Sequence, residues 1–371
     1  MSAPNRPTAA RPRPAPLRRA GAVVVAVTAA ALLAGCGLRM ETPPPVEPSP
    51  DAVEQARGRT AEDALGLADD ARELLASAPA EPVAAVLADV AAFSELHAEQ
   101  LGGVYDSGLP DPTPSASPTD APDEPAPTAE TVLAALAEDA ATALADADTV
   151  PDGPLARLVG SVATARTDLA GRLAAALGLP APEITVPAPT TEDASTDDGG
   201  EAPSTPSVAP TPGADDASAG APAGLDRTDL DALTLAHDEA GYALEVVAAK
   251  LGGDQRTLAQ QTAAAHRDHA ERWALAAGST GQLDDPRRAA YALPPGLDDP
   301  AVATGVARGV ESAVADTYAT LLASADAGGR GDLLTGLADA TRRARVWGAT
   351  PVAFPGMPEL AAEPLPTPSA G

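Results

Sequence analysis

The fold is decided by the stretch Ala263-Ala-Ala-His-Arg-Asp-His-Ala-Glu-Arg-Trp273. Its apolar residues recur at the spacing of three and four residues that is typical of an amphipathic helix. We predict a helix over 254–277, which ends at Gly278. The residues expected on its inward face are Leu258, Thr262, Ala265, His269, Trp273 and Ala276. His266 is expected at the edge of that face. The stretch therefore predicts the second helix of a four-helix bundle.

Three further segments of similar length surround this helix. We predict helices over 226–251, 300–325 and 332–347, each with apolar residues spaced by three, four and seven. Glycine pairs and prolines separate the segments, and neither residue type favours a helix interior. Four such helices joined by short connections are typical of an antiparallel bundle, with one longer crossover after the second helix.

Three motifs in this region carry a family resemblance. Tyr291-Ala-Leu-Pro-Pro295, Arg343-Ala-Arg-Val-Trp347 and Pro351-Val-Ala-Phe-Pro-Gly-Met-Pro-Glu359 together resemble a ferritin-like domain family of unknown function, found at the C-terminus of actinobacterial proteins. The resemblance covers residues 225–359. It implies a ferritin-like four-helix fold and implies no established activity.

The first half of the chain predicts a second bundle. Apolar periodicity favours helices over 51–78, 82–101, 128–147 and 154–177. His97-Ala-Glu-Gln-Leu101 matches His269-Ala-Glu-Arg-Trp273, late in the second helix of each half. This match suggests a tandem duplication, in which both histidines are buried. Chance similarity between alanine-rich helices is the alternative.

The N-terminus predicts export and lipid anchoring. Residues 1–19 carry five arginines and no acid, residues 20–34 are apolar, and Leu33-Ala34-Gly35-Cys36 fits a lipobox with cleavage before Cys36. Cys36 is the one cysteine of the chain. We therefore expect a lipoprotein signal peptide over 1–35 and a protein held at the outer face of the cell membrane through lipid on Cys36. An ordinary signal peptide is the alternative, and Sec and Tat export both remain open.

Composition divides the rest of the chain. Residues 36–50 are a proline-rich tether, and residues 181–223 hold eight prolines, eight acids and no Lys or Arg, which indicates a disordered linker. We therefore predict an all-α chain: a bundle over 51–180, the linker, a ferritin-like bundle over 224–360, and a disordered tail over 361–371.

Net charge excludes some partners. The chain has 24 Lys and Arg against 53 Asp and Glu, a net charge of −29, and removal of the five signal-peptide arginines leaves it near −34. Such a charge argues against nucleic acid and against adhesion to an anionic membrane surface.

Metal chemistry is the specific alternative to a structural bundle. His266 and His269 lie three residues apart, and Glu239, Glu245 and Glu311 on neighbouring helices complete a set of metal ligands. However, no Glu-x-x-His occurs in the chain, although the ferritin di-metal pattern uses it twice. The other hypothesis is that the histidines are hydrogen-bonded structural residues.

No nucleophile elbow or phosphate loop is present in the sequence, so we identify no catalytic residue and no cofactor. The sequence thus favours a non-enzymatic, lipid-anchored extracytoplasmic protein that presents bundles to an unidentified envelope partner or supports envelope structure. The alternatives are a metal-binding ferritin-like oxidoreductase or storage module, and a ligand-binding lipoprotein that serves a transporter.

Overall fold

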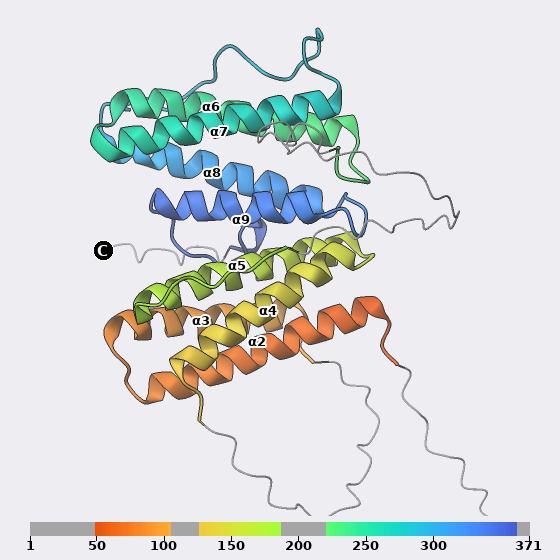
Figure 1. Cartoon of the computed structure of the whole chain (residues 1–371), viewed down its shortest axis with the longest axis vertical. Helices are drawn as coiled ribbons and strands as arrows, with labels where there is room; N and C mark the ends of the chain where they lie inside the picture. The colour runs from red at the N-terminus through yellow and green to blue at the C-terminus, as the bar shows by residue number, and fades with distance from the viewer. Residues whose placement is uncertain (1–48, 105–125, 187–219, 362–371) are drawn as a thin grey trace, which may run out of the picture. The chain divides into compact units, whose positions relative to one another are not determined.

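Eight α-helices in two groups make up the computed structural model, over its described residues 49–104, 126–186 and 220–361 (Figure 1). The N-terminal group contains α2 (Ala52–Ala76), α3 (Glu81–Gln100), α4 (Ala129–Thr149) and α5 (Gly153–Leu177). Helices α2 and α3 form one pair and α4 and α5 the other, and the pairs pack through α2 on α4 and α3 on α5. The all-helical fold class and the two groups are confirmed.

The C-terminal group repeats this order of pairing. It contains α6 (Arg227–Lys250), α7 (Gly253–Ala277), α8 (Pro300–Leu322) and α9 (Gly331–Val346), followed by a single 3-10 turn at Pro358–Leu360. Helix α6 packs on α7, α8 packs on α9, and α6 packs on α8. Each helix begins and ends within three residues of the bounds predicted from the sequence.

Short polar side chains fix where the helices begin. A side-chain oxygen of the residue before the helix accepts a hydrogen bond from a backbone N–H of the first turn, which has no partner inside the helix. The residues that cap helices in this way are Asp51, Thr128, Asp152, Asp226 and Asp299. Gly178 and Gly278 end α5 and α7 in the left-handed conformation, which costs glycine nothing.

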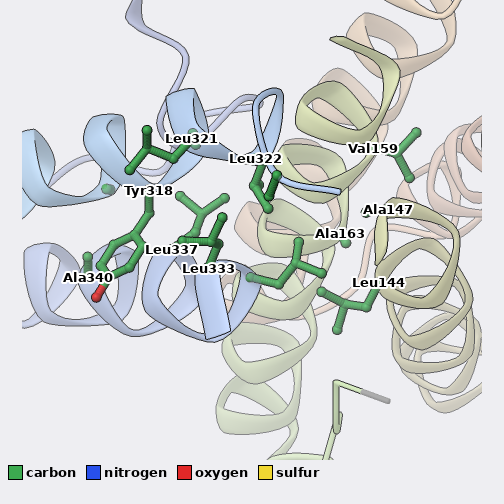
Figure 2. Packing of buried hydrophobic residues seen from close by; sticks show 14 of the residues in the cluster. Leu144, Ala147, Val159, Ala163, Tyr318, Leu321, Leu322, Leu333, Leu337 and Ala340 are labelled. Atoms are coloured by element: carbon green, nitrogen blue, oxygen red, sulfur yellow. The ribbon is translucent and has the colours of Figure 1, made fainter. Parts of the chain in front are cut away.

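The two groups pack against each other through α5, which contacts both α8 and α9. Figure 2 shows the shared core: Leu144, Ala147, Val159 and Ala163 from the N-terminal group face Leu322, Leu333 and their neighbours from the C-terminal group. Small residues make this approach possible. A Cβ at Gly160 would lie 2.8 Å from Cδ2 of Leu334, and one at Gly153 would clash with the carbonyl oxygen of Ala323.

A buried arginine joins the α8–α9 turn to the end of α4. Arg330 is 2% exposed, and its Nη1 donates to the carbonyl oxygens of Ala147, Asp148 and Val150 at 3.0, 3.1 and 2.7 Å. Its Nε donates to two carbonyls of its own turn, and its backbone N–H donates to Oδ1 of Asp148 at 2.7 Å. Burial lowers the pKa of Arg330, yet the guanidinium remains charged because its ordinary pKa is so high.

The segments outside the eight helices are described only in part. The described residues from Pro50 onward form one compact unit. The predicted signal peptide and lipobox, and most of the predicted tether and linker, lie outside the described residues. At the ends of the linker, Ile184 and Val186 pack on the core and Asp326 donates its N–H to Ala223. Within the part of the chain that is described, no helix is long and apolar enough to cross a membrane.

Replacement of Arg330 by alanine should destabilise the whole protein. The change leaves several buried carbonyl groups without their donor, and each buried polar group that loses its partner costs about 1–3 kcal/mol. We expect the free energy of unfolding to fall by more than about 3 kcal/mol in denaturant titrations. The control is Arg308→Ala, whose exposed guanidinium makes one long contact to Gly348. Equal stability of the two variants would show that Arg330 does not hold the groups together.

Candidate functional site

A continuous chain of hydrogen-bonded polar side chains crosses the interior of the C-terminal group. Tyr318 Oη lies 2.8 Å from His237 Nε2, and His237 Nδ1 lies 2.8 Å from His266 Nδ1. His266 Nε2 lies 3.1 Å from Glu311 Oε1, and Glu311 Oε2 accepts from Arg343 Nε at 2.8 Å. We call these five residues the polar chain. They come from α6, α7, α8 and α9, so the chain connects all four helices of the group.

The polar chain is shielded from water except at one end. His237, His266, Glu311 and Tyr318 are each at most 1% exposed. The side chain of Arg343 is 18% exposed and lines a groove of about 280 Å³ between α7 and α9, which make little contact with each other. Water therefore reaches the chain only on the Arg343 side.

Local sequence explains why these side chains meet. Glu311 and Tyr318 are seven residues apart on α8 and therefore lie on one face, two turns from each other. Gly241 lies one turn beyond His237 on α6 and lets α7 come close. A Cβ at Gly241 would lie 3.4 Å from the carbonyl oxygen of Ala263 and 3.6 Å from Cβ of His266. The missing side chain brings the two imidazole rings within hydrogen-bond distance.

The partners determine where the protons lie. Arg343 has no acceptor atom, so it donates to Glu311, which we assign as an ionised carboxylate. His266 then donates Nε2–H to Glu311 and accepts at Nδ1 from His237 Nδ1–H, and His237 Nε2 accepts from the Tyr318 hydroxyl. This assignment satisfies every contact with two neutral histidines and leaves one buried ion pair, Glu311–Arg343. Each hydrogen bond along the chain is therefore donated in the same direction, from Tyr318 through His237 and His266 to Glu311.

The pKa shifts agree with this assignment. Burial holds the pKa of His237 well below its ordinary value, and the neighbouring His266 lowers it further. Burial also raises the pKa of the Tyr318 phenol. Both residues are therefore neutral at pH 7, as the hydrogen bonds require.

The prediction of the buried face of α7 was wrong at the histidines and at Ala265, which is exposed. His266 is 1% exposed and belongs to the polar chain, whereas His269 is only half-buried. The ring of His269 stacks on His237 at 4.9 Å, and its Nδ1 accepts from Arg272 Nη2 at 3.3 Å. Burial is also the main cause that lowers the pKa of His269, to about 4. Alanine occupies so many positions of α7 that the apolar residues do not define one face.

Of the five candidate metal ligands, the structure brings together His266 and Glu311. Glu239 and Glu245 are exposed on α6, and Glu245 pairs with Arg267 Nε at 2.6 Å. His269 is connected to His266 and Glu311 only through its stacking contact with the ring of His237. No group of three or more His, Cys, Asp or Glu side chains with metal-binding geometry occurs within residues 49–104, 126–186 and 220–361.

His97 lies in a different environment from His269. It is fully buried, as predicted, and its Nε2–H donates to the carbonyl oxygen of Ala353 at 2.7 Å. Its ring contacts the edge of Phe354, with ring centroids 5.2 Å apart, and burial lowers its pKa to about 3. The prediction that the two histidines are both buried is therefore right for His97 and wrong for His269.

The sequence reasoning did not assign His237, Tyr318 and Arg343 to a site. His237 continues the predicted apolar stripe of α6, four residues after Leu233 and three before Ala240, so the periodicity contained the signal. The pairing of Arg343 with Glu311 joins positions 32 residues apart on two helices. No pattern of neighbouring residues in the sequence predicts such a contact between two helices.

A comparison with protein families bears on this region. Residues 230–359, about a third of the chain, match the model of a family whose function is unknown. The family is the one described as "Domain of unknown function (DUF4439)". The match contains the whole polar chain and ends within the single 3-10 turn. No curated protein and no solved structure matches the chain.

The ion pair at the end of the polar chain should dominate its stability. Arg343→Met leaves the Glu311 carboxylate buried without a counter-charge, so we expect a loss of about 2–4 kcal/mol in the free energy of unfolding. Glu311→Gln/Arg343→Met should cost less than the sum of the single changes, since neither charge remains. Denaturant titrations of the four proteins measure this coupling.

Arg342→Met is the matched control for this cycle. Arg342 is the neighbouring residue, and its exposed side chain pairs with Asp339 at 3.0 Å. Its loss should cost less than about 0.5 kcal/mol. If Glu311→Gln and Arg343→Met prove additive, the two residues are not energetically coupled and the polar chain is not a unit.

Proposed function

We propose that this chain is a non-enzymatic, lipid-anchored extracytoplasmic protein that presents its helical groups to a partner in the cell envelope. In this proposal the C-terminal group is ferritin-like in fold, as its sequence motifs suggest, and serves as a scaffold. Three features support the proposal: the lipobox at Leu33–Cys36, the high net negative charge, and the closed hydrogen-bonding of the polar chain.

The closed hydrogen-bonding is the observation that carries the non-enzymatic part. Both carboxylate oxygens of Glu311 and all four ring nitrogens of His237 and His266 have partners inside the group. A general base or a metal ligand needs a free lone pair directed at a substrate or an ion. In the polar chain both oxygens of Glu311 and the acceptor nitrogen of each histidine already accept a hydrogen bond. The arrangement therefore favours a role in fixing how the four helices pack.

A metal-binding ferritin-like function is the second candidate. The contact between His266 and Glu311 favours it, because a histidine and a glutamate from facing helices are the donors that bundle metal sites use. An ion would have to displace Arg343 from Glu311 and His237 from His266. Glu239, Glu245 and His269 would need to move toward that pair to complete its shell.

Metal content and thermal stability distinguish the two candidates. We expect elemental analysis of the purified chain to find no stoichiometric metal. Its melting temperature should not change with added Zn²⁺, Mn²⁺ or Fe²⁺, since only a ligand of the native state stabilises it. A metal-induced rise in the wild type that disappears in His266→Leu would refute the structural role and support the metal site. Arg342→Met provides a control that should respond to metal as the wild type does.

Anchoring through Cys36 is tested separately. Acyl chains on Cys36 stabilise membrane attachment by about 0.8 kcal/mol per buried CH₂ group, so their loss should release the protein. We expect Cys36→Ala to move the protein from the membrane fraction to the soluble fraction, while Thr42→Ala in the tether leaves it in the membrane. A Cys36→Ala protein that stays membrane-bound at the wild-type level would contradict the lipid anchor.

A further inference from the structure

A cavity of about 550 Å³ lies between the two helix groups, away from the polar chain. Helices α3 and α5 of the N-terminal group, helices α8 and α9 of the C-terminal group, and the segments 349–358 and 360–361 line it. We call it the interface cavity. Its volume falls in the range of small-molecule sites, which are about 300–1,000 Å³ and mostly apolar with a few polar groups.

Much of the lining of the interface cavity is apolar. Phe354 and Met357 are each 8% exposed, and Phe93 and Leu360 pack against the same cluster. Leu96 and Val352 also line the cavity and are 41% and 47% exposed. An apolar ligand body in the cavity would cover part of their surface.

The lining of the cavity also contains a carboxylate without a salt bridge. Asp316 on α8 is half-buried, and its carboxylate makes no hydrogen bond or close ion pair with any described residue. Burial raises its pKa, and the charge of Glu359 raises it further. The charge of Arg157 lowers the pKa of Asp316 in turn, but Arg157 forms its ion pair with Glu359, at 2.7 Å. Asp316 therefore lines the cavity with no salt bridge of its own among the described residues.

The remaining polar residues of the cavity differ from Asp316. Asp168 has two arginines within 4 Å, Arg345 Nε at 3.5 Å and Arg172 Nη1 at 3.9 Å. Thr341, nine-tenths buried, lines the cavity and its hydroxyl has no hydrogen-bond partner among the described residues. The charged lining is thus two carboxylates and one guanidinium, with a net charge of −1.

We propose that the interface cavity binds an amphipathic cation whose protonated amine pairs with Asp316 and whose apolar body lies against Phe354 and Met357. An anionic ligand would meet the unpaired carboxylate and be repelled. A neutral apolar ligand would bury Asp316 without a partner, which is costly for an ionised group. An ammonium group removes that cost and can donate a further hydrogen bond to Thr341. This inference is independent of the lipid anchor and of the role of the polar chain.

Three eight-carbon probes of different charge test the proposal on the purified chain by isothermal titration calorimetry. We expect octylammonium to bind with one-to-one stoichiometry, octanol to bind at least tenfold more weakly, and octanoate not to bind. Asp316→Asn should weaken octylammonium at least tenfold and leave octanol unchanged. The isosteric change removes an unpaired charge, so the variant should melt no lower than the wild type.

Asp298→Asn is the control, because this exposed carboxylate at the start of α8 pairs with Lys250 and is not part of the cavity lining. It should bind octylammonium as the wild type does. Equal binding of octanol and octylammonium would overturn the proposal, as would octylammonium binding that Asp316→Asn does not change. Absence of octylammonium binding would also overturn it. None of these results depends on whether Cys36 is lipidated or whether the polar chain binds metal.

Discussion

A guanidinium without access to water must donate to acceptors inside the protein, and Nη1 of Arg330 finds them where the two helix groups meet. The carbonyl groups of Ala147, Asp148 and Val150 lie at the end of α4, where a helix leaves its last carbonyls without intrahelical partners. Arg330 supplies donors to them from the α8–α9 turn. The contact of Arg330 with the end of α4 fixes where the two groups meet. The packing of α5 against α8 and α9 is a consequence of that position. Glycines at 153 and 160 then allow the close approach that the fixed position requires.

Arginines that bond to partners inside the protein recur in both groups, and alanine-rich cores explain why. Alanine buries little apolar area per residue, so polar contacts have more influence on which helices pack together. In the N-terminal group, Arg166 is fully buried and donates to the carbonyl oxygen of Thr60 at 2.9 Å. Asp139 lies near it, and burial together with Asp63 raises the pKa of Asp139 to about 6. In the C-terminal group, Arg343 and Glu311 play the corresponding part. Directional contacts of this kind select one helix arrangement where apolar packing alone permits several.

The sequence predicted the helices well because each carries its own local signals. Apolar spacing, capping residues such as Asp226 and terminal glycines such as Gly278 act within a few residues of each other. The inward face of α7 was mispredicted because alanine occurs on both buried and exposed faces of a helix. The pattern therefore did not decide which of His266 and His269 lies on the buried face. The contacts of Arg330 span about 180 residues, and that of Arg343 with Glu311 links two helices. Such pairings depend on how the helices pack, which no local pattern encodes.

The segment after α9 shows why the two groups have to be considered together. The family match ends at residue 359 and includes this segment, yet several partners of the segment lie outside the match. His97 donates to Ala353, and Ser161 donates to the carbonyl oxygen of Pro355 at 2.7 Å. Without the N-terminal group, Phe354 and Met357 would lose the surface formed by Phe93 and Val162. The interface cavity exists for the same reason, since its walls come from both groups. Any ligand that fills it would therefore stabilise the contact between the groups as well as its own site.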